Sequence, residues 1–267
     1  MQSNPADGGP GGVRIVTCAV HKGGTGKTTC AVHLVHRLAM KKQRVLLVDC
    51  DTQGNASSAF TDERLHDGAA SALFDGTGAD VFITDTDLDN VLVVPADDAM
   101  ADIEQMPVGA EDHFASNVRS LAADYGCGWV VIDTPPTIGF GMLAPLVASD
   151  FAFSPIVADP YGMQGVQSLL NRINQVQDQK NDALRYLGLL INRVNNRSID
   201  QKEAIVAMRA ALGDYIIPHQ IGERSSIARV AFTRKPVWQV AGGAAGVGAT
   251  EMRRAMDYLI SRMGGLK

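Results

Sequence analysis

Residues 21–29 of the chain, HKGGTGKTT, have the composition and spacing of a loop that binds phosphate. Glycines at three positions allow the backbone to approach phosphate oxygens closely, and the backbone N–H groups and the following helix N-terminus supply partial positive charge. A glycine-rich turn that served only to enter a helix would not require a lysine and a threonine after the last glycine. The residues expected to hold phosphate are Gly23, Gly24, Thr25, Gly26, Lys27, Thr28 and Thr29.

Two lysines stand in this loop, although a phosphate-binding loop requires only one. Lys27 places a full positive charge at the outer phosphates, and the hydroxyl of Thr28 is a ligand for magnesium. The usual pattern opens with a glycine, but His21 occupies that position and Lys22 follows it directly. Lys22 therefore has no role within an ordinary phosphate loop.

Three aspartates end apolar runs in other parts of the chain. RVLLVDCD ends in Asp49 and Asp51, and GWVVIDTPP places Asp133 at the end of a second run. The carboxyl ends of parallel strands lie beside the crevice where such sheets bind ligands, and magnesium requires carboxylate oxygens. A single aspartate at a strand end could merely cap the next helix, but three on two strands favour a metal site.

The elements that would position these residues alternate along the chain. A β-branched run at 13–20 precedes an amphipathic stretch at 28–42 and a second run at 44–49, which predicts a βαβ unit. Because the runs are apolar throughout, they predict an α/β fold with a mostly parallel twisted sheet and helices on both faces. Four further apolar runs lie at 91–96, 128–133, 151–157 and 186–192.

The length and composition fit a single globular unit. With 267 residues and 46% hydrophobic residues, the chain can bury a sizeable core. We expect residues 1–12, rich in Gly and Pro, to form a flexible tail and residues 13–267 to form one domain, with 57–89 as a short helix and loops at its edge. No apolar run of 18 residues and no signal-like start are present, so we expect a cytoplasmic protein.

The four cysteines, Cys18, Cys30, Cys50 and Cys127, show no CxxC spacing and no pairing with nearby histidines. This argues against a zinc site or a disulfide framework and predicts reduced thiols.

Charge is unevenly distributed, and the net charge of -5 hides the difference. Residues 1–184 carry 11 Lys and Arg against 23 Asp and Glu, whereas residues 185–267 carry 13 against 6. A basic C-terminal third could dock on a polyanion, although charge also varies between ordinary solvated faces.

Taken together, these motifs resemble the ParA/MinD family of deviant Walker A P-loop ATPases. KGGTGKTT resembles its Walker A sequence, VLLVDCDTQGNAS its DxDPQGN element and VVIDTPPTIG its Walker B element. SPIVADPYGMQGV, GLLINRV and IPHQIGERSSIARVAFTRKPVWQV continue the resemblance in the same order, so that it covers residues 13–263. The likeness is strongest to short, IncC-like plasmid ParA partition ATPases.

The resemblance implies a Mg²⁺-dependent ATPase in which two subunits sandwich two ATP molecules. Lys22 matches the lysine that crosses to the phosphates of the opposite subunit, where a cation supplied in trans stabilises the transition state. Lys27 then serves its own ATP. Asp51 matches the residue that orients the attacking water, Asp49 supports magnesium through its shell, and Asp133 is the Walker B carboxylate.

The resemblance also implies contacts with the adenine and shows two departures from the family pattern. Asn192 and the backbone near Pro218 are expected beside the base. Thr52 stands where the family usually has proline, which relaxes the loop after Asp51. Val20 and His21 replace a usual Asn-Gln pair, and histidine adds a group that titrates near neutrality. These departures bear on the rate of hydrolysis, because neither removes a ligand.

Three functions compete within this family. The first is partition of plasmids or chromosomes by an ATP-dependent homodimer that binds DNA without sequence preference, associates with the nucleoid and is released when a ParB-like centromere-binding protein stimulates hydrolysis. The basic C-terminal third favours it. The candidate DNA contacts are Arg193, Arg197, Arg224, Arg229, Arg234 and Lys235.

The second function is a MinD- or FlhG-like positioning ATPase that binds membrane through its C-terminal helix. Six apolar residues share one stripe there, namely Met252, Ala255, Met256, Leu259, Ile260 and Met263. Most such stripes pack on a core, and this one holds no Trp or Phe. The third, a cluster-holding protein like the nitrogenase iron protein, is disfavoured by the absence of a CxxC pair.

Overall fold

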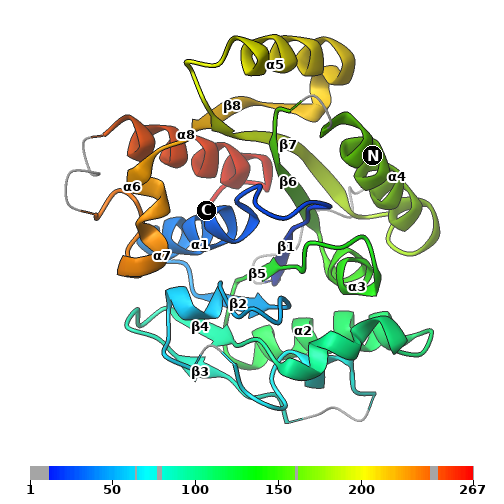
Figure 1. Ribbon diagram of the computed structural model, residues 1–267. Helices are drawn as coiled ribbons and strands as arrows, with labels where there is room; N and C mark the ends of the chain where they lie inside the picture. Colours follow the sequence, from blue (N-terminus) through cyan, green and yellow to red (C-terminus); the bar gives the residue numbers. More distant parts are fainter. Residues whose placement is uncertain (1–11, 64, 77–79, 160–161, 241–245, 267) are drawn as a thin grey trace, which may run out of the picture.

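A computed structural model describes residues 12–266 apart from 64, 77–79, 160–161 and 241–245. Its centre is an eight-stranded sheet in the order β3-β4-β2-β5-β1-β6-β7-β8 (Figure 1). All neighbouring strands pair in parallel except β3 and β4, which pair antiparallel at one edge. The predicted α/β fold with a mostly parallel sheet is therefore confirmed.

The central strands β1, β2 and β5 are short and almost entirely buried, which explains their unbroken apolar sequences. The bounds of all eight strands are β1 Arg14–Cys18, β2 Val45–Asp49, β3 Thr84–Asp85, β4 Val91–Val94, β5 Trp129–Asp133, β6 Phe151–Val157, β7 Arg185–Val194 and β8 Ile216–Gly222. The register pairs Cys18 with Asp133, and Asp133 with Asp49. The sheet thus brings two of the predicted acidic residues side by side at the carboxyl end of adjacent strands.

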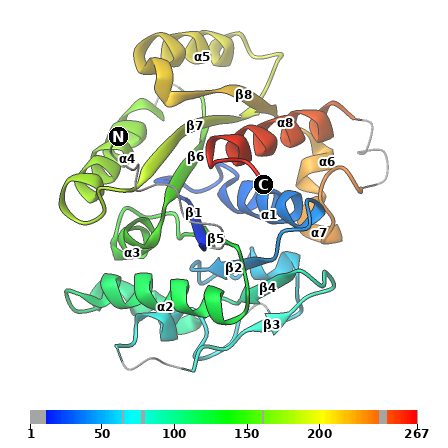
Figure 2. The same ribbon diagram turned by 180° about the vertical axis from the view of Figure 1, so that it is seen from behind.

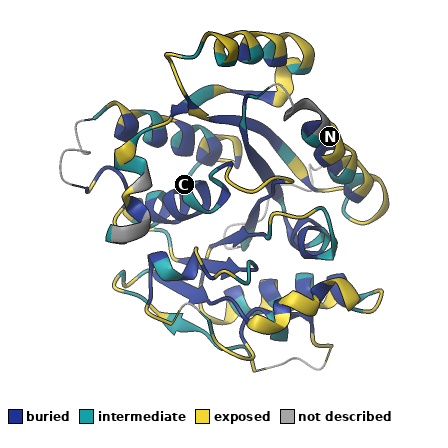
Figure 3. Ribbon diagram, in the orientation of Figure 1, coloured by how far each residue is buried: buried dark blue, intermediate teal, exposed yellow. Residues whose placement is uncertain are grey.

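Helices cover both faces of this sheet (Figures 1 and 2). One face packs against α1 (Lys27–Met40), α7 (Val230–Thr233) and α8 (Val247–Arg262), with α6 (Ser225–Ala228) alongside α8. The opposite face packs against α2 (Ala110–Asp124), α3 (Phe140–Ala148), α4 (Gly162–Gln179) and α5 (Ile199–Leu212). Figure 3 shows the resulting burial. The central strands are mostly buried (dark blue), and the outward faces of the helices are exposed (yellow).

Residues 57–89 lie at the edge of the sheet, as predicted. They form the 3₁₀ helices η1 (Ser57–Ala59) and η2 (Ser71–Phe74) and the two-residue strand β3. A third 3₁₀ helix, η3 (Asp98–Gln105), follows β4, and η4 (Gly213–Tyr215) leads into β8. The predicted tail at residues 1–12 lies, except for residue 12, outside the described residues.

The C-terminal helix α8 buries the apolar stripe that a membrane-binding helix would need to expose. The six apolar residues of the predicted stripe, in α8 and at its C-cap, are each at most 3% exposed and belong to the same core cluster as α1. The amphipathic pattern therefore reflects packing on the sheet, and the membrane-binding interpretation of this helix is wrong. Within the described residues, no helix is long and apolar enough to cross a membrane.

Two histidines of α1 are buried in the same core, which makes the stability of the fold depend on pH. Burial lowers the pKa of His33 to about 4, although its bond to Thr29 opposes the shift. Burial and the neighbouring His33 lower the pKa of His36 to about 3. Both side chains are therefore neutral in the folded protein at neutral pH.

We predict that acid weakens the fold through His36. Its folded-state pKa lies below the ordinary value of about 6.5, so the unfolded chain binds more protons and stability falls as pH drops from 6.5 toward 3. Relative to His36→Gln, the wild type should lose about 1 kcal/mol of unfolding free energy between pH 7 and pH 5.5. Urea denaturation at both pH values measures this, and an unchanged difference between the two proteins would contradict it.

Candidate active site

The loop between β1 and α1 bends at two positions whose backbone conformation only glycine adopts easily. Gly24 and Gly26 have φ angles of 75° and 86°, in the left-handed region. A Cβ atom on Gly26 would also lie 2.3 Å from Nδ2 of Asn192, which donates a hydrogen bond to the Thr25 carbonyl at 2.8 Å. The loop is therefore shaped by its glycines and held from the neighbouring strand β7 by Asn192.

Lys27 and Thr28, at the start of α1, meet Asp133 at the end of β5. The Lys27 ammonium lies 2.9 Å from Oδ1 of Asp133, and the Thr28 hydroxyl donates to Oδ2 at 2.7 Å. Asp51 adds a second carboxylate 3.7 Å from the ammonium. The structure thus brings together four of the residues for which we predicted phosphate, metal or water contacts.

The charges of this cluster are set by burial and by their mutual contacts. Burial lowers the pKa of Lys27, but the contact with Asp133 outweighs this and raises it above the ordinary lysine value. Burial raises the pKa of Asp133, and Lys27 and Thr28 counteract the rise by favouring the carboxylate. The two side chains therefore form a buried ion pair in which each charge depends on the other.

Asp49 lies beside Asp133 in the sheet register and holds the neighbouring loop through its carboxylate. Its Oδ2 accepts hydrogen bonds from the backbone N–H and the hydroxyl of Ser57, each at 2.8 Å, and its Oδ1 accepts from the Asp51 N–H at 3.2 Å. Burial and the nearby Asp133 raise its pKa to about 7. Asp49 thus anchors the loop that carries Asp51, and Ser57 is a partner that sequence reasoning missed.

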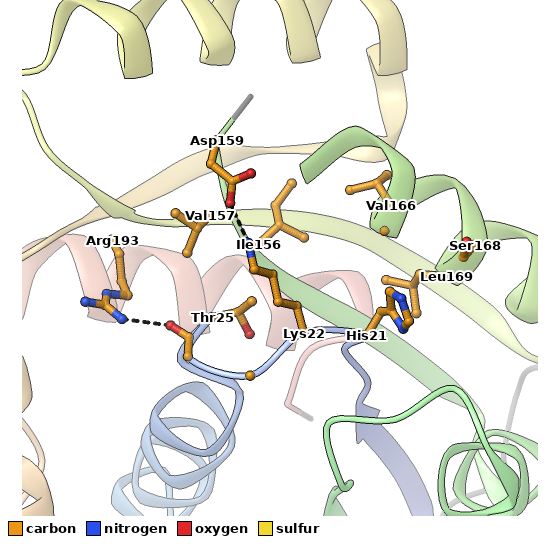
Figure 4. A pocket seen from close by; sticks show the side chains of 13 residues that line it. His21, Lys22, Thr25, Ile156, Val157, Asp159, Val166, Ser168, Leu169 and Arg193 are labelled. Carbon is orange, nitrogen blue, oxygen red and sulfur yellow. Dashed lines mark hydrogen bonds and ion pairs between the residues drawn. The ribbon is translucent and has the colours of Figure 1, made fainter. Parts of the chain in front are cut away.

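The Lys22 side chain extends from the loop toward Asp159 (Figure 4). It is 65% exposed, and its ammonium lies 3.0 Å from Oδ2 of Asp159, just after β6. Both residues line a pocket of about 610 Å³ between the loop and α4, with Ile156 and Leu169 on its apolar side. The two lysines of the loop therefore face different surroundings, one buried beside Asp133 and one at the surface.

Two smaller pockets lie on the other sides of the loop. One of about 270 Å³ is lined by residues of the loop, including Lys22, Lys27 and Thr28, and by Asp51 and Pro136. The other, of about 350 Å³, is lined by Gly26, Thr29, Asn192, Gly222 and Ile227, among others. They adjoin at the loop glycines, as a phosphate chain and an attached base would require.

Pro218 does not reach this region. It lies four residues before Gly222 in β8 and lines a separate pocket with Tyr186, Tyr215 and Tyr258. The expectation that Pro218 lies beside the base is therefore wrong, because the carboxyl end of the parallel strand β8, at Gly222, is the part that meets the loop.

Three of the six arginine and lysine residues predicted to contact DNA are engaged within the protein. Arg193 donates to the Gly24 carbonyl at 2.8 Å and pairs with Glu223 at 2.7 Å. Arg224 forms a two-pronged pair with Glu251 at 3.0 and 2.7 Å. Arg234 pairs with Asp62. The others, Arg197, Arg229 and Lys235, are exposed.

Arg193 also has a structural role that we did not predict, although its place in the sequence indicated one. Arg193 follows Asn192 near the carboxyl end of β7, the end at which parallel sheets gather ligand-binding residues. It supports the phosphate loop through Gly24 and lines the adjoining pocket. The ion pair of Arg224 with Glu251 could not be predicted from local sequence, because the two residues are 27 positions apart.

The donor atoms near Lys27 fit a magnesium ion that also binds phosphate. The Thr28 hydroxyl and Asp133 Oδ2 are 2.7 Å apart, close to the spacing of about 2.9 Å between adjacent oxygens around octahedral Mg²⁺. The described residues hold no group of three or more His, Cys, Asp and Glu side chains that could enclose a metal. Hydroxyl and carboxylate oxygens are donors that Mg²⁺ accepts, and substrate phosphates and water commonly complete its coordination.

We predict that Gly26→Ala damages the loop and that Gly23→Ala does not. Alanine at 26 must adopt a positive φ and displace Asn192, so the unfolding free energy should fall by about 2 kcal/mol. Gly23 is the matched control, since nothing lies within 4 Å of a Cβ there, and its change should stay within about 0.5 kcal/mol. Urea denaturation of both variants tests this, and equal losses would contradict it.

Comparisons with known proteins agree with this geometry. A family model described as an AAA domain matches residues 13–186. IncC of Escherichia coli is 32% identical over 260 residues, covering 94% of this chain and 70% of IncC. The chromosome-partitioning ATPase Soj of Thermus thermophilus is 30% identical over 251 residues, covering 94% of this chain and 97% of Soj.

A solved structure shares the fold at lower sequence identity. The complex of a Cyanothece McdA variant with ATP superposes with a TM-score of 0.81 at 18% identity, covering 96% of this chain and 98% of McdA. The sequence matches extend through the phosphate loop, the strand ends and the basic C-terminal third. The chain belongs to the ParA/MinD family of P-loop ATPases.

Proposed function

We propose that the protein is a ParA-type partition ATPase that hydrolyses ATP to ADP and phosphate as a Mg²⁺-dependent homodimer. The observation that carries this is the separation of the two loop lysines. The Lys27 side chain is 6% exposed and paired with Asp133, whereas the Lys22 side chain is 65% exposed and paired with Asp159. The membership of a family that includes partition proteins supports the same function.

ATP would bind along the loop, and the residues around it would have separate roles. Lys27 and the loop N–H groups hold the phosphates, while the base lies near Asn192 and Gly222. Thr28 and Asp133 would hold magnesium, which when bound would supply positive charge to the phosphoryl oxygens. Asp51, at the edge of the phosphate pocket, orients the attacking water, and Asp49 fixes the Asp51 loop through Ser57.

The proposed role of Lys22 depends on a second subunit. The Lys22 ammonium pairs with Asp159 at the surface, whereas Lys27 pairs with the buried Asp133. We infer that Lys22 serves the ATP of a partner in a face-to-face dimer. A cation supplied in trans stabilises transition-state charge in the manner of an arginine finger. The 3.0 Å pair with Asp159 must open for this, and an exposed pair of this kind opens at a cost of about 1 kcal/mol or less.

We predict that three variants separate these roles. Lys27→Ala should abolish ATP binding because the buried charge is lost. Lys22→Ala should bind ATP as a monomer while losing the ATP-dependent dimer or its hydrolysis. Asp51→Ala should bind ATP, turn it over at least about a hundredfold more slowly and remain a dimer. Fluorescent-nucleotide titration, light scattering and phosphate release measure the three properties, and wild-type turnover by Asp51→Ala would refute its assignment.

The dimer would act on DNA. We propose that its ATP-bound form binds DNA without sequence preference and associates with the nucleoid in the cytoplasm. A ParB-like centromere-binding protein would then stimulate hydrolysis and release it, which segregates a plasmid or chromosome. The basic C-terminal third supports this, because exposed lysine and arginine bind phosphate without reading bases. Arg229 and Lys235 are the preferred contacts, since both are exposed near α6 and α7.

We predict that ATP, and not ADP, allows the protein to retard arbitrary duplex DNA. Affinity should fall steeply with salt, and the double variant Arg229→Ala/Lys235→Ala should reduce the slope of log affinity against log salt by about 2. Arg119→Ala is the control, because Arg119 is an exposed arginine on α2, which packs on the opposite face of the sheet. Gel retardation at several salt concentrations tests this, and equal DNA binding with ATP and ADP would refute the proposed cycle.

A further inference from the structure

His33 connects the phosphate loop's helix to the basic C-terminal segment. It lies in α1, fully buried, six residues after Lys27. Its Nδ1 is 2.6 Å from the Thr29 carbonyl, and its Nε2 is 3.1 Å from the backbone N of Val237. A carbonyl can only accept and a backbone N–H can only donate, so Nδ1 carries the ring proton and Nε2 accepts from Val237.

Val237 lies in a tight turn immediately after the exposed basic residues. The Gln239 N–H donates to the Pro236 carbonyl at 2.8 Å, which makes Val237 the second residue of a four-residue turn. Val237 and Trp238 are buried, whereas Lys235 is exposed directly before the turn. The turn is therefore the point where the basic segment enters the core.

Packing around the turn explains why the histidine bond matters there. The Trp238 ring meets the His33 ring edge-on with 5.3 Å between centroids, and Arg253 of α8 lies over Trp238 at 5.7 Å. These contacts are apolar or diffuse, and they do not satisfy the Val237 N–H. Without an acceptor at the position of His33 Nε2, that buried donor would be unpaired, which costs enough to displace the turn.

We propose that His33 is a positioning residue for DNA binding, which holds the basic segment at Arg229 to Lys235 in place by accepting the Val237 N–H. This rests on the proposed DNA-binding function. The other end of the same side chain contacts Thr29, within the loop expected to hold phosphate. One buried imidazole therefore links the nucleotide loop and the segment expected to contact DNA.

Two substitutions at this position separate the two bonds. The amide of Gln reaches the place of Nε2, so His33→Gln can still accept from Val237. The shorter Asn reaches only the place of Nδ1, so His33→Asn keeps the bond to Thr29 and loses the bond to Val237. Both replace an aromatic ring by an amide, and equal ATP affinity of the two variants shows that the larger cavity left by Asn does not disturb the nucleotide loop.

The experiment measures hydrogen exchange at the Val237 amide and affinity for a random-sequence DNA duplex with ATP. His33→Asn should exchange at least about tenfold faster at Val237 and bind DNA at least about fivefold more weakly than His33→Gln, with equal ATP affinity. His36→Gln is the control, because it also replaces a buried histidine on the same face of α1 by an amide. It should match wild type in both readouts. Equal exchange or equal DNA affinity of the Gln and Asn variants overturns the proposal.

A second variant removes the donor instead of the acceptor, in case His33→Asn does not fold. Val237→Pro deletes the N–H at the second position of a turn, where proline is favoured. It should weaken DNA binding at least about fivefold and leave ATP binding unchanged, and wild-type DNA affinity would overturn the proposal. If the wild type bound no DNA, the proposed function would fail, while the exchange rates would still decide whether His33 holds the turn.

Discussion

The buried ion pair between Lys27 and Asp133 is the interaction on which the site depends. Its 2.9 Å contact joins the first residue of α1 to the last residue of β5, across the strand pairing that sets Cys18 beside Asp133. Removing one partner would leave an uncompensated charge in the core, which typically costs several kcal/mol. The same carboxylate accepts a hydrogen bond from the Thr28 hydroxyl. One aspartate therefore positions both the loop lysine and the predicted metal ligand.

The sequence predicted the parts of the fold whose apolar runs are continuous. The central strands and α1 were recognisable because parallel strands buried on both faces have no polar alternation. Strand β8 was not recognised, since Pro218, His219 and Gln220 interrupt its apolar run at the sheet edge. Helix α3 was also not singled out, because Pro145 lies inside it, and α5 has apolar residues on both its buried and its exposed faces.

The phosphate loop itself was predictable from local spacing, but its supports were not. Local sequence identified Lys27, Thr28 and Asp133, whose meeting follows from the parallel register. The partner of Asp49, Ser57, depends on how the intervening loop folds back. The partner of Lys22, Asp159, depends on long-range packing, because it is 137 residues away. The arginines show the same limit, because positive charge in the sequence does not reveal which side chains Glu223 and Glu251 neutralise.

The central claim is that Lys22 acts on the ATP of the partner subunit, and mixing two inactive variants tests it most directly. Lys22→Ala keeps an intact pocket that lacks a partner's lysine, and Asp51→Ala has a defective pocket but can donate Lys22. In an equimolar mixture, half of the dimers would carry one complete site, so ATP hydrolysis should recover to about a quarter of the wild-type rate. A mixture no more active than either variant alone would contradict the account.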